Sequence, residues 1–333
     1  MIHYFFNIQY QMDTFQYFLE DIIIILCSFL SDFDKCYFLS CCKNFHEKKQ
    51  IIRFNETIDI KKICTLSYFN SFINIILENI ILTEDIFVFP RYVKKLKCIN
   101  CSGNFIFPQT LISLSWSSDH KLHEKNLPTS LKILEIKNQK NHAQTIVQHT
   151  KNLQSLIIQS KNKISFEKYY PATVTRLEWN CDKSFVLNKN WNILYLKINS
   201  RGIWTNTCSS LKILEFGPRC SFTIRWNNEP NKNLKKLIID SNRIKFIDCN
   251  KKIICNNNSD DSKSSDSKSS DSDEKQRYTL PSQCSIKKLV FGKHFKKSIT
   301  GIIPPSVIKC TFHGGKYKGI LPSTVKKIII IND

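Results

Sequence analysis

A six-residue pattern recurs along most of the chain at intervals of about twenty residues, and no other feature limits the possible folds as strongly. The pattern is an aliphatic residue, two variable residues, a second aliphatic residue, one variable residue and a bulky apolar residue, as in LKILEI at 131–136. Successive copies are 18 to 23 residues apart, except for one interval of 52. A period of this length is typical of a solenoid rather than a closed globule. The eleven copies begin at Val93, Leu111, Leu131, Leu153, Val174, Ile193, Leu211, Leu234, Ile286, Val307 and Val325.

Proline and hydroxyl residues recur in phase with this pattern. In six copies a proline stands three residues before the opening aliphatic, and in five of these Thr or Ser directly precedes it. Proline has no N–H to donate to a strand ladder, so it suits the turn before a strand. Two periodicities in phase therefore predict one turn and one strand per unit. The residues are Pro90, Pro108, Pro128, Pro171, Pro304 and Pro322, with Thr110, Ser130, Thr173, Ser306 and Thr324.

Each strand is expected to point its fixed apolar positions inward and the residues between them outward. One unit cannot bury its apolar face alone, whereas a stack of parallel strands about 4.8 Å apart can. We therefore expect one continuous buried column along the solenoid. Its leucines are Leu114, Leu134, Leu156, Leu177, Leu196, Leu214, Leu237 and Leu289.

Four consecutive units carry lysine at the same outward position, directly before the second aliphatic residue. We call Lys236, Lys288, Lys309 and Lys327 the lysine ridge and take them as the candidate partner-binding face of the solenoid. Stacked in register, their ammonium groups repel one another. The ridge therefore either extends into solvent or is matched by an anionic partner, and the sequence leaves both interpretations open.

The N-terminal part has a different period. Residues 14–54 predict two helical runs, the second capped by Asp32 or Asp34. Residues 55–92 are interpreted as a connector and N-terminal cap, and residues 93–333 as the solenoid. The first helical run has apolar residues at helical spacing, namely Phe18, Ile22, Ile25, Leu26, Phe29 and Leu30.

The interval of 52 residues contains an insertion at 256–275 that is rich in serine and aspartate. It lacks the apolar residues needed for a core, which predicts disorder. A flexible segment of this length reaches about 20 Å, so it could shield the lysine ridge or act only as a spacer. Ser270, with an acid three residues later at Asp273, is a candidate phosphorylation site that would add negative charge.

Composition limits the possible partners and compartments. The formal charge of +21 indicates either a basic surface for nucleic acid or another anionic partner, or the lysine-rich composition that AT-rich coding produces. The 14 cysteines, without a signal-peptide pattern, predict free thiols in the reducing cytoplasm. The longest apolar run, Ile22 to Leu30, is too short to span a bilayer, so no membrane partner is expected.

Catalytic and metal-binding patterns are not found in the sequence. There is no glycine-rich phosphate loop and no Cys-His or Ser-His-Asp set with positional logic. Cys98 and Cys101 form a CxxC pair without the further ligands that a structural zinc needs. His120 and His123 form an HxxH pair that lacks further ligands in the same way. We therefore expect no enzyme activity, no cofactor and no metal.

Residues 289–307, LVFGKHFKKSITGIIPPSV, are similar to the FNIP repeat, a relative of the leucine-rich repeat. Lys296 stands where asparagine is usual, and the middle units keep only the aliphatic part of the motif. The resemblance implies a leucine-rich-repeat-like parallel β solenoid. The matching residues are Leu289, Phe291, Gly292, Phe295, Ile299, Gly301, Pro304, Ser306 and Val307.

The N-terminal module resembles an F-box. Phe18-Leu19 replaces the usual Leu-Pro opening, Asp21 replaces a glutamate, and residues 41–45 supply the Cys-Lys-x-Phe end of the motif. The resemblance implies that this module docks a Skp1-like protein of a cullin ubiquitin ligase. The residues implied to dock are Phe18, Leu19, Asp21, Ile22, Leu26, Phe29 and Leu30.

The predicted fold class is therefore α+β, a small helical F-box-like module followed by a leucine-rich-repeat-like parallel β solenoid. The paired resemblance is to F-box and FNIP-repeat proteins of amoebae and of large DNA viruses that infect them. It implies a substrate-recognition adaptor in the cytoplasm, which is the host cytoplasm for a viral member, with the nucleus left open. The alternatives are a basic nucleic-acid-binding solenoid and a scaffold whose F-box docks nothing.

Overall fold

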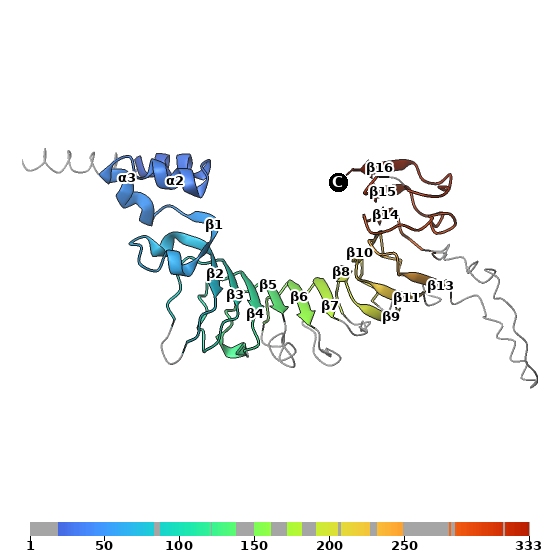
Figure 1. Cartoon of the computed structure of the whole chain (residues 1–333), viewed down its shortest axis with the longest axis horizontal. Helices are drawn as coiled ribbons and strands as arrows, with labels where there is room; N and C mark the ends of the chain where they lie inside the picture. Colours follow the sequence, from blue (N-terminus) through green and yellow to red (C-terminus); the bar gives the residue numbers. More distant parts are fainter. Residues whose placement is uncertain are drawn as a thin grey trace, which may run out of the picture. The chain divides into compact units, whose positions relative to one another are not determined.

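The computed structural model describes residues 19–82, 87–120, 122–137, 150–160, 172–181, 191–205, 208–226, 232–248, 280, 284–315 and 317–332. The chain divides into two compact units, Met1–Asn152 and Leu153–Asp333. Figure 1 labels their helices and strands.

The first unit begins with helices and continues as a parallel sheet with the strand order β1-β2-β3-β4-β5. Residues 19–28 are helical. The other helices are α2 (Asp32–Phe38), α3 (Lys43–Glu47), η1 (Lys48–Gln50), η2 (Ile60–Lys62), η3 (Phe69–Ser71) and η4 (Glu124–Asn126). The strands are β1 (Phe54–Asp59), β2 (Phe72–Glu78), β3 (Lys95–Ile99), β4 (Ser113–Ser117) and β5 (Ile133–Lys137).

The second unit is built from parallel strands in two sheets. The larger sheet has the order β6-β7-β8-β10-β12-β14-β15-β16, and the smaller has the order β13-β11-β9. The strands of the larger sheet are β6 (Ser155–Ser160), β7 (Arg176–Cys181), β8 (Tyr195–Ile198), β10 (Ile213–Phe216), β12 (Lys236–Ile239), β14 (Lys288–Phe291), β15 (Lys309–His313) and β16 (Lys327–Ile331). Those of the smaller sheet are β9 (Arg201–Thr205), β11 (Ser221–Trp226) and β13 (Lys245–Asp248).

The leucines of the repeated pattern form the predicted buried columns. All eight are fully buried. Within each compact unit, leucines of neighbouring strands stand opposite one another, as Leu156, Leu177 and Leu196 do. The bulky residue that ends the pattern is buried too, as Trp116 and Trp179 are, in every unit except the last, where Ile330 is 52% exposed. The predicted parallel β solenoid is thereby confirmed.

The prolines and hydroxyl residues form the corners between units. Pro108 accepts a hydrogen bond from the N–H of Leu111 (3.0 Å), and the same bond recurs at Pro90, Pro128, Pro304 and Pro322. The Thr110 hydroxyl donates to the carbonyl oxygen of Val93 (2.9 Å), which opens the preceding unit. Ser130 and Ser285 make equivalent bonds to the preceding units. At these three positions the hydroxyl therefore joins a corner to the corner before it, whereas the buried Thr324 hydroxyl has no partner among the described residues.

One expectation for the N-terminal part needs correction. The N-cap of α2 is Ser31, whose hydroxyl accepts from the N–H of Asp34, and not Asp32 or Asp34 as expected. The segment at 55–92, interpreted as a connector and N-terminal cap, contains β2 and most of β1. Strand β2 follows the repeat pattern with Phe72, Ile75 and Leu77 as its buried positions, and an opening phenylalanine in place of an aliphatic residue concealed it.

Candidate partner-binding surfaces

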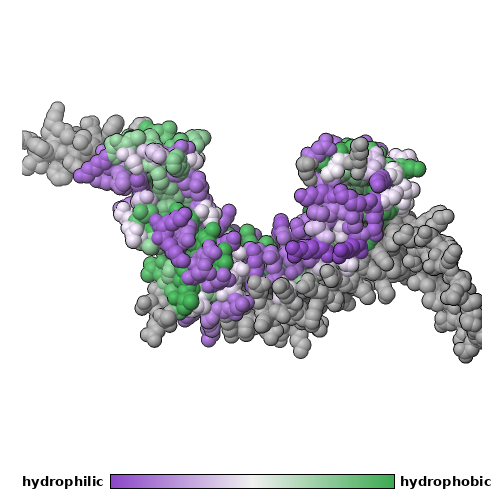
Figure 2. Space-filling model, viewed as in Figure 1, coloured by the Kyte–Doolittle hydropathy of each residue, from purple (hydrophilic) through white to green (hydrophobic). Residues whose placement is uncertain are grey.

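The helix at 19–28 and the start of α2 expose large apolar side chains. Phe29 is 82% exposed, Ile25 is 58% and Leu26 is 47%, whereas Ile23 and Cys27 on the other side of the helix are buried. Figure 2 shows hydrophobic colouring over these N-terminal helices. Contiguous exposed apolar surface on a protein usually marks an interaction site. We call this surface the helical patch. It consists of Ile22, Ile24, Ile25, Leu26, Phe29, Phe33 and Tyr37.

The helical patch overlaps the predicted docking residues only in part. Asp21, Ile22, Leu26 and Phe29 are exposed, and Leu19 and Leu30 are half-buried. Phe18 lies outside the described residues. These placements do not test docking itself.

Sequence reasoning missed part of the patch. It did not single out Phe33 and Tyr37, whose rings meet edge to face with centroids 4.6 Å apart. They stand four residues apart on α2, a spacing that places both on one face and that could have revealed them.

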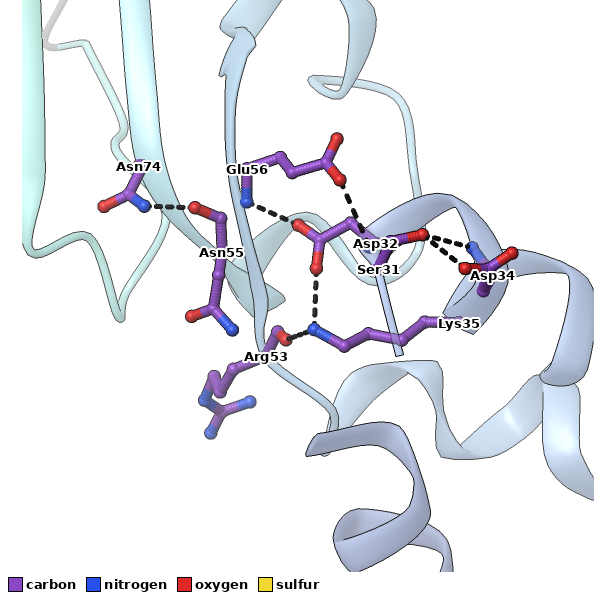
Figure 3. A network of polar contacts seen from close by, with 8 residues as sticks. All are labelled: Ser31, Asp32, Asp34, Lys35, Arg53, Asn55, Glu56 and Asn74. Atoms are coloured by element: carbon purple, nitrogen blue, oxygen red, sulfur yellow. Dashed lines mark hydrogen bonds and ion pairs between the residues drawn. The ribbon is translucent and has the colours of Figure 1, made fainter. Parts of the chain in front are cut away.

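A polar network attaches these helices to the first strand (Figure 3). The buried ammonium of Lys35 donates to Asp32 Oδ1 (2.6 Å) and to the carbonyl oxygen of Arg53 (3.1 Å). The other carboxylate oxygen of Asp32 accepts from the N–H of Glu56 in β1 (2.6 Å), and the Glu56 carboxylate accepts from the N–H of Asp32 (3.3 Å). A buried lysine is tolerated only when it is paired in this way.

The helices therefore cover the β1 end of the first unit as a solenoid cap does. A terminal cap normally has a polar outer face, because that face meets only solvent. The helical patch is apolar instead. Capping alone thus explains the network but does not explain the patch.

The lysine ridge has the register that the sequence predicted. Lys236 stands opposite Lys288, Lys288 opposite Lys309, and Lys309 opposite Lys327. Among the described residues none of the four has an ion-pair partner. Figure 2 shows mostly hydrophilic surface over these last strands.

The outward face of β5 to β10 differs because its acids are paired. Glu135 meets Lys137 (3.1 Å), Glu178 meets Arg176 (2.5 Å), and Glu215 meets Lys197 (2.6 Å). The two residues that follow each ridge lysine are uncharged in all four units, for example Leu237 and Ile238 after Lys236. Among the described residues, lysines without an ion-pair partner therefore stack at one position over the last four units, whereas the cations within β5 to β10 pair with acids. Lys95 and Lys97 of β3 are exposed and have no ion-pair partner there either.

Cys98 and Cys101 lie in the packed interior of the first unit. Both thiols are buried, and the described part of the chain holds no cluster of metal-ligand side chains. Burial raises the pKa of Cys98, while a hydrogen bond between the two thiols lowers the pKa of Cys101 to about 7. His120 and His123 do not join such a cluster either. No helix among the described residues is long and apolar enough to cross a bilayer.

Three predicted features fall outside the described residues. They are Phe18, the insertion at 256–275 and Ser270 within it.

Comparison with known proteins supports the fold. No protein-family model matches the chain, and no curated protein matches it. A solved structure described as the crystal structure of CroV588, a novel circular LRR protein structure, is similar with a TM-score of 0.50 and 19% identity. The match covers 83% of this chain and 38% of that one, so the chain spans well under half the length of this relative. The F-box and FNIP resemblances rest on the sequence motifs alone, and what the comparison shows is a leucine-rich-repeat-like solenoid.

Proposed function

We propose that this chain is a non-enzymatic adaptor that docks one protein through the helical patch and holds a second protein on the outward face of the solenoid. The helical patch carries the proposal, because a cap needs no apolar outer face. A repeat solenoid suits such a role, since its stacked strands present a long, regular surface.

The proposed partner of the helical patch is a Skp1-like subunit of a cullin ubiquitin ligase, working in the cytoplasm. The F-box-like sequence of residues 18–45 supports this partner. The exposed Leu26 and Phe29 are suited to enter an apolar groove, and Asp21 adds a charge at the edge of the same surface. The protein held by the solenoid is the proposed target of the ligase.

Capture of a purified Skp1-like protein tests the docking step. Leu26→Asp with Phe29→Asp should abolish capture, because two carboxylates would have to be desolvated in an apolar interface. Both side chains are exposed, so the variant should keep its thermal melting temperature. Ile106→Asp with Ile320→Asp is the matched control, since it places two charges at exposed apolar positions outside the patch.

Two results would count against the docking proposal. One is capture by the Leu26 and Phe29 variant at the wild-type level. The other is absence of capture by the wild-type chain, which would leave the solenoid as a scaffold whose helical module only caps it.

A second function, nucleic-acid binding by the lysine ridge, is favoured by four ammonium groups in register that have no ion-pair partner among the described residues. Such binding releases counterions, so affinity for a duplex should fall by orders of magnitude between about 50 and 200 mM salt. Replacing Lys288 and Lys309 with alanine should reduce the salt dependence as well as the affinity. Binding that is insensitive to salt and to these replacements would exclude this function for the ridge.

A further inference from the structure

The turns that join the two sheets of the second unit enclose a pocket. Residues 199–200 connect β8 to β9, 217–220 connect β10 to β11, and 240–244 connect β12 to β13, so the turns lengthen along the chain. With Asn180 of β7, and with His294 and Lys296 from the segment after β14, they line a volume of about 480 Å³ at the carboxyl ends of the strands. The lysine ridge lies at the opposite, amino ends of its strands, so the two features are separate.

Cations gather in this pocket without matching acids. Arg219, Arg243 and Lys296 all line it, and within the described parts of the chain none of them forms an ion pair. The neighbouring acid, Asp240, is already occupied, because its carboxylate accepts from the backbone N–H of His294 (2.9 Å) and contacts His294 Nδ1 (3.0 Å). The lining therefore carries an excess of positive charge.

The backbone around the pocket is held by side chains that reach from one unit to the next. Asn199 Oδ1 accepts from the N–H of Arg219 (2.9 Å), as Asp240 does from His294. Each side chain lies against a glycine of the next repeat, Asn199 against Gly217 and Asp240 against Gly292. A Cβ at Gly217 would lie 2.9 Å from Asn199 Oδ1, and one at Gly292 would overlap Asp240 Oδ1. These positions thus fix the turns before any ligand arrives, and a preorganised site loses less entropy on binding.

Two polar atoms in the pocket lining have no hydrogen-bond partner among the described residues. One is the hydroxyl of Ser200, a residue that is 2% exposed, and the other is the buried Asn180 Oδ1. Asn180 lies at the same position in its repeat as Asn199 does. The residue next to Asn180 in the neighbouring repeat is Asn199, whereas the residue next to Asn199 is Gly217. Buried polar groups without partners destabilise a fold and often mark where a ligand binds.

We propose that this pocket binds a phosphate or phosphomonoester group. Guanidinium groups match phosphate oxygens in pairs of parallel hydrogen bonds, and Lys296 adds a further positive charge. The Ser200 hydroxyl donates to a phosphate oxygen. Inorganic phosphate keeps at least one proton throughout the neutral pH range, and a phosphomonoester keeps one below about pH 6. That O–H donates a hydrogen bond to Asn180 Oδ1. Sulfate has no such proton, so the pocket selects phosphate over sulfate.

The group can be free or carried by a larger molecule, and both sources present the same chemistry. The volume lies within the range of small-molecule sites, roughly 300 to 1,000 Å³. The inference does not depend on docking at the helical patch, since the pocket belongs to the other unit of the chain.

Isothermal titration calorimetry of the full-length protein tests the site at constant ionic strength. Inorganic phosphate should bind more tightly than sulfate. Arg219→Ala with Arg243→Ala should weaken phosphate binding by about tenfold or more, since two charge-assisted contacts are lost. Lys95→Ala with Lys132→Ala removes the same charge from exposed positions of the first unit and should change affinity less than about twofold.

Ser200→Ala gives an independent readout that does not alter charge. It should weaken phosphate binding severalfold while leaving the melting temperature of the ligand-free protein unchanged or raised, because the removed hydroxyl bonds to no described residue. A purely structural Ser200 would lower the melting temperature instead. The same melting curves establish whether the double arginine variant is folded.

Titrations with O-phosphoserine and with a phosphoserine-containing peptide distinguish the two sources. Tighter binding of the peptide means that the group is carried by a larger molecule, and equal or weaker binding means that it is a free small ligand. No measurable binding of any phosphate compound would overturn the proposal. Equal losses in the arginine and lysine variants, or equal affinity for sulfate and phosphate, would overturn it too, because both indicate non-specific attraction.

Discussion

Cysteines in this chain differ in chemistry because the repeat places them at different depths. Cys220 and Cys310 are buried in the second unit, whereas Cys64 is exposed. Burial raises the pKa of Cys220 to about 12 and the pKa of Cys310 to about 11. The same residue type is thus a packed apolar group at some positions and an accessible thiol at others.

These raised pKa values predict a loss of stability at alkaline pH. In the unfolded chain a thiol titrates near pH ~8.5, so the unfolded state loses its proton first. Each buried, neutral thiol contributes its full amount to the free energy of unfolding below that pH. The contribution is lost as the pH rises toward 11 to 12. Between those limits each thiol should lower the free energy of unfolding by about 1.4 kcal/mol per pH unit.

Urea denaturation from pH 7 to pH 10 measures this slope. Cys220→Ala and Cys310→Ala should each make the slope shallower, and Cys64→Ala should leave it as in the wild type. Identical slopes for all four proteins would contradict the buried, neutral state of the two thiols.

At the scale of the element, the attachment of α2 to β1 depends on the buried ion pair between Lys35 and Asp32. The side chains of Lys35 and Asp32 are only 4% and 12% exposed. Lys35→Ala would leave the Asp32 carboxylate buried without its cation, at a cost of about 3–5 kcal/mol. Hydrogen exchange should accelerate in β1, and Asp32→Asn with Lys35→Met should recover part of the loss.

The pair between Lys137 and Glu135, whose side chains are 28% and 22% exposed, supplies the comparison for this prediction. Lys137→Ala should cost less than about 1 kcal/mol, because solvent reaches this pair and screens it. If Lys35→Ala cost no more than Lys137→Ala, the polar network would not be what holds α2 on the sheet.

The elements that could be predicted from sequence are those that obey the repeat. All eleven units of the pattern contain a strand, because inward apolar residues at a fixed spacing leave few alternatives. The smaller sheet escaped prediction, since its strands β9, β11 and β13 follow the repeat strands after turns of two to five residues and lack a motif of their own. Ser31 was missed as the N-cap of α2 because Asp32 and Asp34 are equally good capping types.

At the scale of the whole chain, the predictability of a site depends on how local it is. The lysine ridge could be predicted, since register follows from the repeat once the strands stack. The helical patch could be predicted in part, because four of its residues lie within one helical run. The phosphate pocket could not be predicted, because its lining comes from turns of different lengths and no single turn carries a motif.

The solenoid fold also predicts how far along the chain a core substitution lowers local stability. Leu177 is fully buried between Leu156 and Leu196 in the neighbouring strands, so Leu177→Ala leaves a cavity that costs about 2–5 kcal/mol. Because each repeat contacts only its neighbours, the loss should be local. Amide exchange in β6, β7 and β8 should accelerate by at least tenfold, roughly the factor for 1.4 kcal/mol, and exchange in β15 and β16 should change little. Ile213→Ala, which truncates an outward side chain of β10, should cost under about 1 kcal/mol. Uniform acceleration along the whole second unit would mean instead that its strands unfold as one cooperative block.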